Sequence, residues 1–514
     1  MKYRLILIIL FMSFQWADAQ ESVWKTSDSA SQTPFRIVHL TPVQKQLIDR
    51  RYGMFIHFGL NTYLNIEWGD GQAPVSVYKP TKLDCEQWVR TARDAGFRYV
   101  LLVTKHHDGF CLWDSKATDY DVASTDYPTD VVKAVSDACR KYGIQFAIYY
   151  SLWDRHEPSY ASPDFSQYIR FMETQLTELM TQYGEVCELW LDGAWDKGVS
   201  EWQLPRICAL VKKYQPMCAV GVNHGVSGRL EEEHWGWDDC ILPDSCRVDN
   251  RYYLRFSPVD FRLWDPKIAP HDEAKYYMRD GVSYYTPFEH TICLSKVWCW
   301  FSKDKPLPVR NADELEELFY WTTMNDNTLV IDVAPAPDGR LWQHEADAIV
   351  DFARRMGFAQ GKPLPHRDLS QVVSFHSHAE ATSVYLSDKG EYGADKAVDG
   401  GMQTRWAAAD DVLTPSFTLR FDNPRTFNRI AVFEYQETHY AEDNFTNYRK
   451  NRIQKYFIEV KTERGWEIIY VGDEPMGDCK VIRFAYPYTT DAVRLRVTES
   501  TAPPSIYEFE CIAE

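Results

Sequence analysis

Hydrophobic and polar positions along the first two thirds of the chain repeat in blocks that are typical of strand–helix units. Short apolar runs bounded by turn residues predict buried parallel strands. These runs occupy residues 53–56, 99–103, 146–150, 189–191, 219–222 and 328–333. Segments with helical spacing lie between them, such as Cys85 to Gly96 and Asp130 to Gly143. The two glycines stand where a helix C-cap favours a residue that adopts positive φ.

The repeated unit favours a closed barrel. Six strands are clear, and a seventh and eighth can lie in the irregular stretch between Trp235 and Trp300. Repetition over about 300 residues is more typical of a (β/α)8 barrel than of an open doubly wound sheet. The residues after the first strand, His57 to Asn61, lack a dinucleotide-binding glycine pattern, which weakens the doubly wound alternative. We therefore expect an α/β fold, a TIM-like barrel over residues 36–358.

The pattern changes after Phe358. Residues 359–369 include Gly361-Lys362-Pro363-Leu364-Pro365 and read as a linker. Beyond it, helical spacing gives way to period-two alternation in residues 417–421, 430–433, 456–460 and 493–497. We expect an antiparallel β-sandwich over residues 370–514.

The N-terminus predicts export. Lys2 and Arg4 precede the apolar run of residues 5–12, and Ala17-Asp18-Ala19 follows it as a small-x-small cleavage site. These features are typical of a secretory signal peptide, here residues 1–19. No other stretch approaches the ~20 apolar residues that a membrane-spanning helix needs. We expect a periplasmic, extracellular or lysosomal protein without a membrane span.

Composition narrows the class of partner. The chain has 56 Lys and Arg against 74 Asp and Glu, a net charge of −18, which argues against nucleic acid as a partner. Aromatic residues make up 15% of the 514 residues, and their flat rings suit the apolar faces of sugars. The 12 cysteines do not form CxxC pairs, so most are expected to be buried thiols. Nothing in the sequence indicates an oligomeric state.

Polar residues gather at the ends of the predicted strands, where a barrel of this type carries its catalytic groups. They are His57, Lys105-His106-His107-Asp108, Tyr149-Tyr150-Ser151, Asp192-Gly193 and Asn223-His224. A single histidine in such a place is often a hydrogen-bonded structural residue. A metal site is not favoured, because adjacent histidines on a strand point to opposite faces and no HxH or HExxH pattern is present.

A carboxylate at a strand end among aromatic residues indicates glycoside hydrolysis, which needs two carboxyl groups. Asp192 is the first, since burying it unpaired would be unfavourable. Glu67, Glu289 and the charge run Glu231 to Glu233 are candidates for the second. Glu289 has apolar neighbours on both sides, which would raise its pKa as a general acid requires. Glu67 precedes Trp68 in a loop and is expected to position the substrate.

At this point a resemblance becomes specific. The ordered motifs are Tyr52-Gly53-Met54-Phe55-Ile56-His57-Phe58-Gly59, Glu67-Trp68, Thr104-Lys105-His106-His107-Asp108-Gly109-Phe110, Tyr149-Tyr150-Ser151, Glu188-Leu189-Trp190-Leu191-Asp192-Gly193 and residues 325–335. Together they resemble the α-L-fucosidases of glycoside hydrolase family 29, over about residues 36–358.

The resemblance implies an exo-acting retaining enzyme that removes terminal α-L-fucosyl groups from oligosaccharides or glycoconjugates. It implies Asp192 as nucleophile, through a covalent fucosyl-enzyme intermediate, and Glu289 as general acid/base. It assigns sugar binding to His57, Glu67, Trp68, His106, His107, Tyr150 and Trp190. Only one of Tyr149 and Tyr150 can face the barrel mouth. Retention requires the two carboxyl groups to be about 5–5.5 Å apart. The segment around Glu289 leans toward the subgroup that cleaves α-1,3 and α-1,4 linkages, and no cofactor is required.

The C-terminal region resembles discoidin-like (F5/8 type C) modules. The matching residues are Ala397-Val398-Asp399-Gly400, Thr404-Arg405-Trp406, Phe417-Thr418-Leu419 and Arg494-Leu495-Arg496-Val497. The resemblance implies a carbohydrate-binding module and a structural calcium ion near the Asp399 turn. A structural buttress for the barrel is the alternative, because this fold hosts many functions.

Three further hypotheses remain open. A glycosidase for another sugar could use the same carboxylates. A non-catalytic glycan-binding protein is a second class, although Asp192, His57, His106 and His107 are all present. A metal-dependent hydrolase is the third, and it predicts that a chelator abolishes activity.

Overall fold

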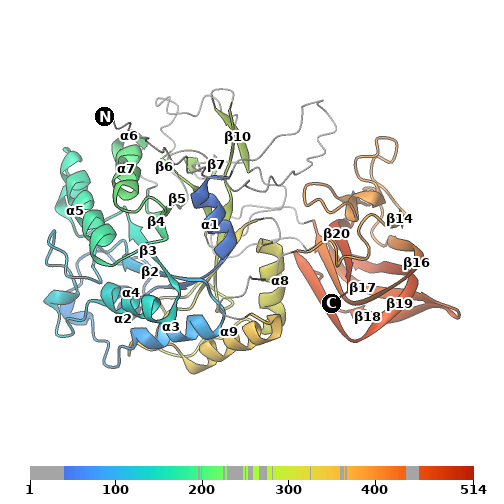
Figure 1. Cartoon of the computed structure of the whole chain (residues 1–514), viewed down its shortest axis with the longest axis horizontal. Coiled ribbons are helices and arrows are strands. Elements are labelled where there is room, and N and C mark those ends of the chain that lie inside the picture. The colour runs from blue at the N-terminus through green and yellow to red at the C-terminus, as the bar shows by residue number, and fades with distance from the viewer. Residues whose placement is uncertain are drawn as a thin grey trace, which may run out of the picture.

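The computed structural model describes residues 40–194, 197, 199–223, 226–227, 247–248, 251–252, 259–265, 275–279, 282–323, 326–358, 364, 367–435 and 451–513 (Figure 1). The predicted signal peptide and Glu231 to Glu233 lie outside them. A barrel ringed by helices is followed by a domain built of antiparallel strands.

Eight parallel strands close the barrel. In spatial order they are β1 (Tyr52–Ile56), β13 (Thr328–Asp332), β12 (Phe288–Cys293), β9 (Phe261–Trp264), β5 (Ala219–Val222), β4 (Glu188–Asp192), β3 (Gln145–Ser151) and β2 (Tyr99–Lys105), which pairs with β1. The barrel prediction is confirmed. β9 and β12 are the two strands expected between Trp235 and Trp300.

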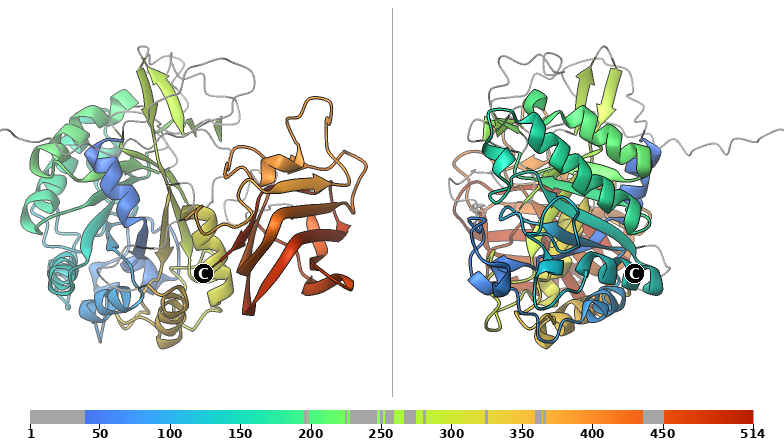
Figure 2. Two further views of the ribbon diagram at one scale, coloured as in Figure 1. Left: turned by 45° about the vertical axis from the view of Figure 1, so that its right-hand side comes forward. Right: turned by 90° about the vertical axis from the view of Figure 1, so that its left-hand side faces the viewer.

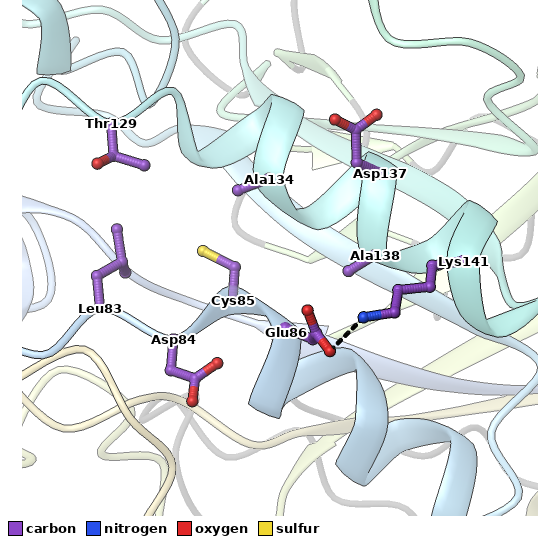
Figure 3. Close-up of a pocket in the computed structure, with 9 residues that line it drawn as sticks. All are labelled: Leu83, Asp84, Cys85, Glu86, Thr129, Ala134, Asp137, Ala138 and Lys141. Atoms are coloured by element: carbon purple, nitrogen blue, oxygen red, sulfur yellow. Dashed lines mark hydrogen bonds and ion pairs between the residues drawn. The ribbon is translucent and has the colours of Figure 1, made fainter.

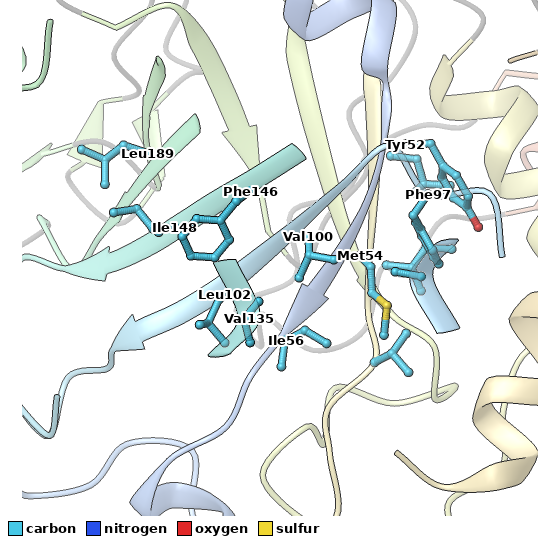
Figure 4. Packing of buried hydrophobic residues seen from close by; sticks show 14 of the residues in the cluster. Tyr52, Met54, Ile56, Phe97, Val100, Leu102, Val135, Phe146, Ile148 and Leu189 are labelled. Carbon is cyan, nitrogen blue, oxygen red and sulfur yellow. The ribbon is translucent and has the colours of Figure 1, made fainter. Parts of the chain in front are cut away.

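Helices cover the outside of the barrel. They are α1 (Pro42–Arg50), α2 (Leu60–Leu64), α3 (Cys85–Asp94), α4 (Val131–Tyr142), α5 (Ser166–Gln182), α6 (Val199–Trp202), α7 (Leu204–Tyr214), α8 (Ala312–Thr323) and α9 (Gln343–Met356). Outward side chains such as Met54, Val100 and Ile148 form one hydrophobic core with them (Figure 4). Gly143 caps α4 at φ 67° and Gly96 follows α3 at φ 74°, as their C-cap positions predicted.

Short strands lie between the fifth and seventh strands of the barrel. β6 (Val226–Ser227), β7 (Arg247–Val248) and β8 (Arg251–Tyr252) form one small sheet, and β10 (Tyr276–Arg279) pairs with β11 (Val282–Tyr285). No helix in the described parts of the chain is long and apolar enough to cross a bilayer.

The C-terminal domain is an antiparallel sheet structure with its own core. Its strands are β14 (His378–Ala381), β15 (Trp406–Ala407), β16 (Ser416–Glu434), β17 (Ile453–Thr462), β18 (Gly465–Gly472), β19 (Cys479–Ser500) and β20 (Ser505–Ile512), and the main path runs β15-β20-β16-β19-β17-β18. Trp406, Phe417 and Leu495 lie in its core. Two predicted strands, 417–421 and 430–433, belong to the single strand β16, whose pairing with β19 shifts register between Arg420 and Arg425.

The two domains share a packed interface beside α8 (Figure 2). Glu316 of α8 is fully buried, and Arg355 of α9 and Arg483 of β19 both donate to its carboxylate. Lys480 lies 3.0 Å from Glu317, and the hydrophobic core of the barrel continues into Val481 and Tyr507. The C-terminal domain is therefore built onto the barrel rather than tethered to it.

Candidate active site

Three aspartates meet at the C-terminal ends of the barrel strands. Asp192 ends β4, Asp332 ends β13, and Asp265 directly follows β9. They are 6%, 2% and 8% exposed, so this edge of the barrel concentrates nearly buried carboxyl groups. Functional groups in barrels of this type stand at this edge.

Asp192 is held in one orientation by its neighbours. The Tyr149 hydroxyl donates to its Oδ2 at 2.7 Å, while the Gly193 amide and the Asn223 Nδ2 donate to its Oδ1 at 2.8 and 3.1 Å. Gly193 has φ 75°, and a Cβ there would lie 2.6 Å from Trp153. Only glycine fits this turn, which sets the carboxylate facing the barrel mouth.

Asp265 is the second carboxyl group of the site. Asn223 Nδ2, which donates to Asp192, also lies 3.2 Å from Asp265 Oδ2. The two carboxyl oxygens can therefore be no more than about 6.3 Å apart, the sum of the two distances from this nitrogen. Asp265 Oδ1 has no hydrogen-bond partner among the described residues. Burial raises the pKa of Asp265 well above its usual range, and the charges of Asp192, Glu67 and Asp332 raise it further.

His57, His106 and His107 all face the site, and the fourth predicted histidine, His224, lies outside the described residues. His57 Nδ1 lies 3.1 Å from Asp332 Oδ2, and the rings of His106 and His107 are 4.2 Å apart. The expectation that adjacent histidines point to opposite faces is wrong here, because β2 ends at Lys105 and both residues lie in the turn beyond it. Burial lowers the pKa of His106 well below its usual range and that of His107 to about 4.

The hydrogen bonds of His107 fix its tautomer. Ser151 Oγ donates its only proton to the Trp153 carbonyl oxygen at 2.6 Å. The same Oγ lies 2.6 Å from His107 Nδ1, so it must accept a proton from that nitrogen. Neutral His107 therefore turns an unprotonated Nε2 toward Asp192, 3.6 Å from Oδ2. This nitrogen can accept a hydrogen bond from a ligand hydroxyl.

Aromatic rings surround the carboxylates. Trp298 Nε1 donates to Glu67 Oε1 at 2.9 Å, and the Trp300 ring stacks on His57 with centroids 4.4 Å apart. Trp68 is 48% exposed and meets His107 edge-on at 5.8 Å. Burial raises the pKa of Glu67, which the bond from Trp298 partly offsets. Such a ring of flat side chains and hydrogen-bonding groups suits a sugar.

Tyr150 does not belong to this site. Its hydroxyl donates to Gln175 of α5 and lies 3.1 Å from the Nζ of Lys105, which pairs with Asp154 at 2.8 Å. Side chains alternate along β3, so Tyr149 points into the barrel and Tyr150 points toward the helices. The expectation that Tyr150 lies at the barrel mouth is wrong: Tyr149 lies there, and its hydroxyl donates to Asp192.

Trp190 and Glu289 also lie away from the barrel mouth. Trp190 is 1% exposed and two residues before Asp192 on the same face of β4, so its indole lies one layer below the carboxylate. Glu289 is fully buried in β12 and accepts from Trp190 Nε1 at 2.9 Å and from the Tyr99 hydroxyl at 2.7 Å. Tyr99 is the first residue of β2, so these contacts place the Glu289 carboxyl near the end of the barrel where the strands begin, which we call the barrel floor. Asp192 lies at the opposite end, the barrel mouth, where the strands finish.

Among the described residues, no group of three or more histidine, cysteine, aspartate or glutamate side chains could hold a metal ion. The Asp399 turn does not fit a calcium ion either. Its carboxylate accepts from the Gly401 amide and the Thr404 hydroxyl. Arg367 lies beside it, donating to the Gly400 carbonyl at 2.7 Å and to Glu510 at 2.6 Å, so a cation already neutralises this cluster.

A hollow of about 370 Å³ lies between α3 and α4 on the outside of the barrel (Figure 3). Leu83, Cys85 and Ala138 line it, and the Glu86–Lys141 ion pair of 2.6 Å crosses it. It has no share in the cluster around Asp192.

The sequence analysis missed Asp265, Asp332, Trp298 and Trp300 as members of the site. The signal was present, because Asp265 and Asp332 follow apolar strands just as Asp192 does. The strand-end rule finds Asp332 directly, and it finds Asp265 only once residues 261–264 are taken as the sixth strand. The two tryptophans sit in a loop, where no periodic pattern marks them.

Comparison with known proteins identifies the families to which the two parts of the chain are similar. The α-L-fucosidase family profile matches residues 19–358, and the F5/8 type C domain profile matches residues 378–509. Alpha-L-fucosidase 1 of Arabidopsis thaliana is 28% identical over 460 residues, which are 88% of this chain and 83% of that protein. The putative alpha-L-fucosidase 1 of Oryza sativa subsp. japonica is 32% identical over 82% of this chain and 74% of its own.

Solved structures show the same fold. A glycoside hydrolase family 29 member from an unknown rumen bacterium superposes with a TM-score of 0.56 at 22% identity, covering 93% of this chain and 77% of its own. A putative alpha-L-fucosidase from Bacteroides thetaiotaomicron gives 0.54 at 22% identity over 94% and 99%. On the family match, which covers more than half its length, this chain belongs to the α-L-fucosidase family of glycoside hydrolases and carries a C-terminal F5/8 type C domain.

Proposed function

We propose that the chain is an exported, exo-acting retaining α-L-fucosidase. Asp192 is the nucleophile and Asp265 the general acid/base. The observation that carries this proposal is the amide of Asn223, which bridges the two carboxyl groups and limits their oxygens to about 6.3 Å. Retaining glycosidases place their carboxyl groups ≈ 5–5.5 Å apart, whereas inverting enzymes need ≈ 6.5–9.5 Å to admit a water molecule.

In the first step the Asp192 carboxylate attacks the anomeric carbon of fucose. The bond from that carbon to the leaving oxygen breaks, and Asp265 gives its proton to this oxygen. A raised pKa keeps Asp265 protonated for this task, and its Oδ1, which has no partner among the described residues, can meet the leaving group.

In the second step Asp265 acts as a base. It takes a proton from a water molecule, whose oxygen attacks the anomeric carbon and displaces Asp192. Two inversions give net retention, and Tyr149 and Asn223 stay bonded to Asp192 to orient it for both attacks.

Sugar binding falls to the polar and aromatic groups around this pair. His107 Nε2 accepts one sugar hydroxyl, while His57, His106 and Glu67 serve as further partners. Trp68, Trp298 and Trp300 supply apolar surface for the C–H face and methyl group of fucose. The lean toward α-1,3 and α-1,4 linkages rests on the resemblance of the segment around Glu289 to that subgroup.

Residues 1–19 act as the export signal in this proposal, and the C-terminal domain acts as a buttress. Its ion pairs at Glu316 and the core it shares with the barrel support this role. Arg367 takes the place of a structural calcium ion, so the enzyme needs no metal.

The test is release of free L-fucose from a Lewis-type trisaccharide and from an aryl α-L-fucoside, with Asp192→Asn beside the wild type. Proton NMR of the first product shows whether the α anomer appears first, as retention requires. Fucose release that Asp192→Asn abolishes supports the proposal. A β anomer as first product rejects the retaining mechanism, and release of another sugar alone rejects the substrate.

A further inference from the structure

The barrel floor holds a second pair of carboxylic acids. Glu188 begins β4, and Arg50 at the end of α1 donates to its Oε2 at 2.6 Å. Glu289 lies against Glu188, and the two carboxyl groups hydrogen-bond to each other. All three side chains are at most 5% exposed. The mechanism proposed above uses none of them.

The pair carries one proton. Two ionised carboxylates cannot hydrogen-bond to each other, and Glu188 Oε1 has no other partner among the described residues. Among the described residues Arg50 forms its ion pair with Glu188, so Glu188 is the anion and Glu289 keeps the proton. Burial raises the pKa of Glu289 well above its usual range, and the negative charge of Glu188 raises it further.

The remaining contacts of Glu289 connect it, through Trp190 and Tyr149, to the proposed nucleophile Asp192. Its Oε1 accepts from the Trp190 indole, and the Trp190 ring stacks on Tyr149 with centroids 5.2 Å apart and planes at 29°. Tyr149 in turn donates to Asp192 at 2.7 Å. Phe55 also packs edge-on against the indole at 5.3 Å, so the bond to Glu289 and these ring contacts together fix where the indole lies beneath Tyr149.

Tyr99 completes the arrangement from across the barrel. Its ring spans the interior to reach Glu289 Oε2 at 2.7 Å. A Cβ at Gly53 would lie 2.3 Å from the Cζ of this ring, so only glycine leaves room for it. The chain thus gives up a side chain in β1 to bring a second hydrogen bond to Glu289.

We propose that Glu289 is a positioning residue for the nucleophile, which it holds through Trp190 and Tyr149, and is not a proton donor to the substrate. This inference rests on the proposed function, since it assigns a role relative to Asp192. It gives the segment around Glu289 a function that needs burial and a hydrogen bond but no access to the sugar.

The experiment compares Glu289→Gln, Glu289→Leu and Trp190→Phe in the full chain. Glutamine keeps an acceptor for Trp190 and a donor for Glu188, and the Tyr99 hydroxyl can turn to accept from the amide, so we expect its kcat/KM within ~5-fold of wild type. Leucine removes the acceptor and should lower kcat/KM by ~30–100-fold, equally for aryl fucosides with good and with poor leaving groups. Trp190→Phe should lose a similar factor, and the Glu289→Leu/Trp190→Phe double variant little more than either.

Two further measurements separate this role from acid/base catalysis. Azide should not restore activity to either Glu289 variant, and the alkaline limb of the pH–rate profile should stay where it is in wild type. In the infrared spectrum, the C=O band of the protonated Glu289 carboxyl should disappear in Glu289→Gln, while that of Asp265 should remain.

The inference is overturned if Glu289→Gln loses ~100-fold or more on poor leaving groups alone and azide restores it. If Glu289→Leu does not fold, Glu289→Gln and Trp190→Phe still decide the question. Failure of wild type to release fucose from any substrate would instead reject the proposed function, and would leave the infrared assignment of the proton standing.

Discussion

The Asp192–Asp265 pair at the barrel mouth and the Glu188–Glu289 pair at the barrel floor are both buried, yet the two pairs are built for different tasks. At the floor, Arg50, Trp190 and Tyr99 all donate to the Glu188–Glu289 pair, which is fully buried. At the mouth, Asp265 shares a single amide with Asp192 and keeps one oxygen without a partner among the described residues.

The contrast shows that burial and a raised pKa do not identify a catalytic acid by themselves. Glu289 and Asp265 both have a pKa raised by burial and by a neighbouring carboxylate. They differ in the hydrogen-bonding capacity that the protein leaves unused. A carboxyl whose oxygens are all occupied by protein donors stabilises its neighbours, whereas one with a free oxygen at the barrel mouth can exchange a proton with a ligand.

The largest effect is expected from Asp265→Asn. An amide cannot give up a proton to a leaving oxygen, so kcat/KM for a natural oligosaccharide should fall ~10³-fold. An aryl fucoside with a good leaving group needs less protonation and should lose far less. Steady-state kinetics across a leaving-group series measures the difference, and azide should restore turnover. Equal loss on every substrate would contradict the assignment of Asp265 and erase the distinction between mouth and floor.

Removing the floor cation is expected to have the next largest effect. Arg50→Met leaves Glu188 buried without its counter-charge and should lower the free energy of unfolding by about 3–5 kcal/mol. Arg206→Met is the matched control, because Arg206 pairs with Glu173 at the surface and should lose less than about 1 kcal/mol. Denaturant titration of both variants provides the comparison. If Arg50→Met were as stable as the control, the floor pair would not depend on this cation.

The sequence predicted the mouth better than the floor for a physical reason. Polar residues after an apolar strand have no packing role, so His57, His106, His107 and Asp192 stand out from the pattern. Inside a strand that is buried on both faces, however, an inward and an outward residue look alike. This is why the sequence does not distinguish Tyr149 from Tyr150, and why the apolar neighbours of Glu289 indicate that it is buried but not how deep in the barrel it lies.

The barrel itself could be predicted because strand and helix periods differ clearly. The irregular stretch between Trp235 and Trp300 hid the sixth and seventh strands, because both interrupt the apolar run with polar residues, Arg262 in β9 and Glu289 and His290 in β12. Asp265 directly follows β9 and is therefore hidden with it, and no local pattern in the sequence pairs Asp265 with Asp192. The pairing depends on Asn223, which donates to both from the end of β5 and becomes visible only in three dimensions.

A smaller effect is expected on stability, because the surroundings of Asp265 in the folded protein disfavour its ionised form. Its pKa is higher in the folded protein than in the unfolded chain, so folding opposes its ionisation. This destabilisation is absent below the unfolded pKa near 4 and grows as the pH rises toward the folded pKa. Asp265→Asn should therefore match wild type at low pH and exceed it by about 1–2 kcal/mol at higher pH. Thermal unfolding across pH measures this, and a constant difference would show that ionisation is not the cause.

The smallest effect concerns a third pair of buried carboxylic acids, Glu508 and Glu510 of the C-terminal domain. Like the pair at the barrel floor, this pair lies beside an arginine. Arg367 bonds Glu510 at 2.6 Å and lies 3.3 Å from Glu508, next to the Asp399 turn where a calcium ion was expected. Because the guanidinium already neutralises these carboxylates, chelator or added calcium should shift the Tm of wild type by less than ~1 °C.

Arg367→Met makes this prediction decisive. The variant leaves Glu508 and Glu510 buried without a cation, so it should unfold at a lower temperature than wild type. Calcium should then raise its Tm by several degrees, because the emptied cluster now offers oxygen ligands to a divalent ion. A calcium-dependent Tm in wild type would mean that Arg367 does not replace the metal. The Arg367 cluster and the Arg50–Glu188–Glu289 cluster at the barrel floor would then share residue types but not a function.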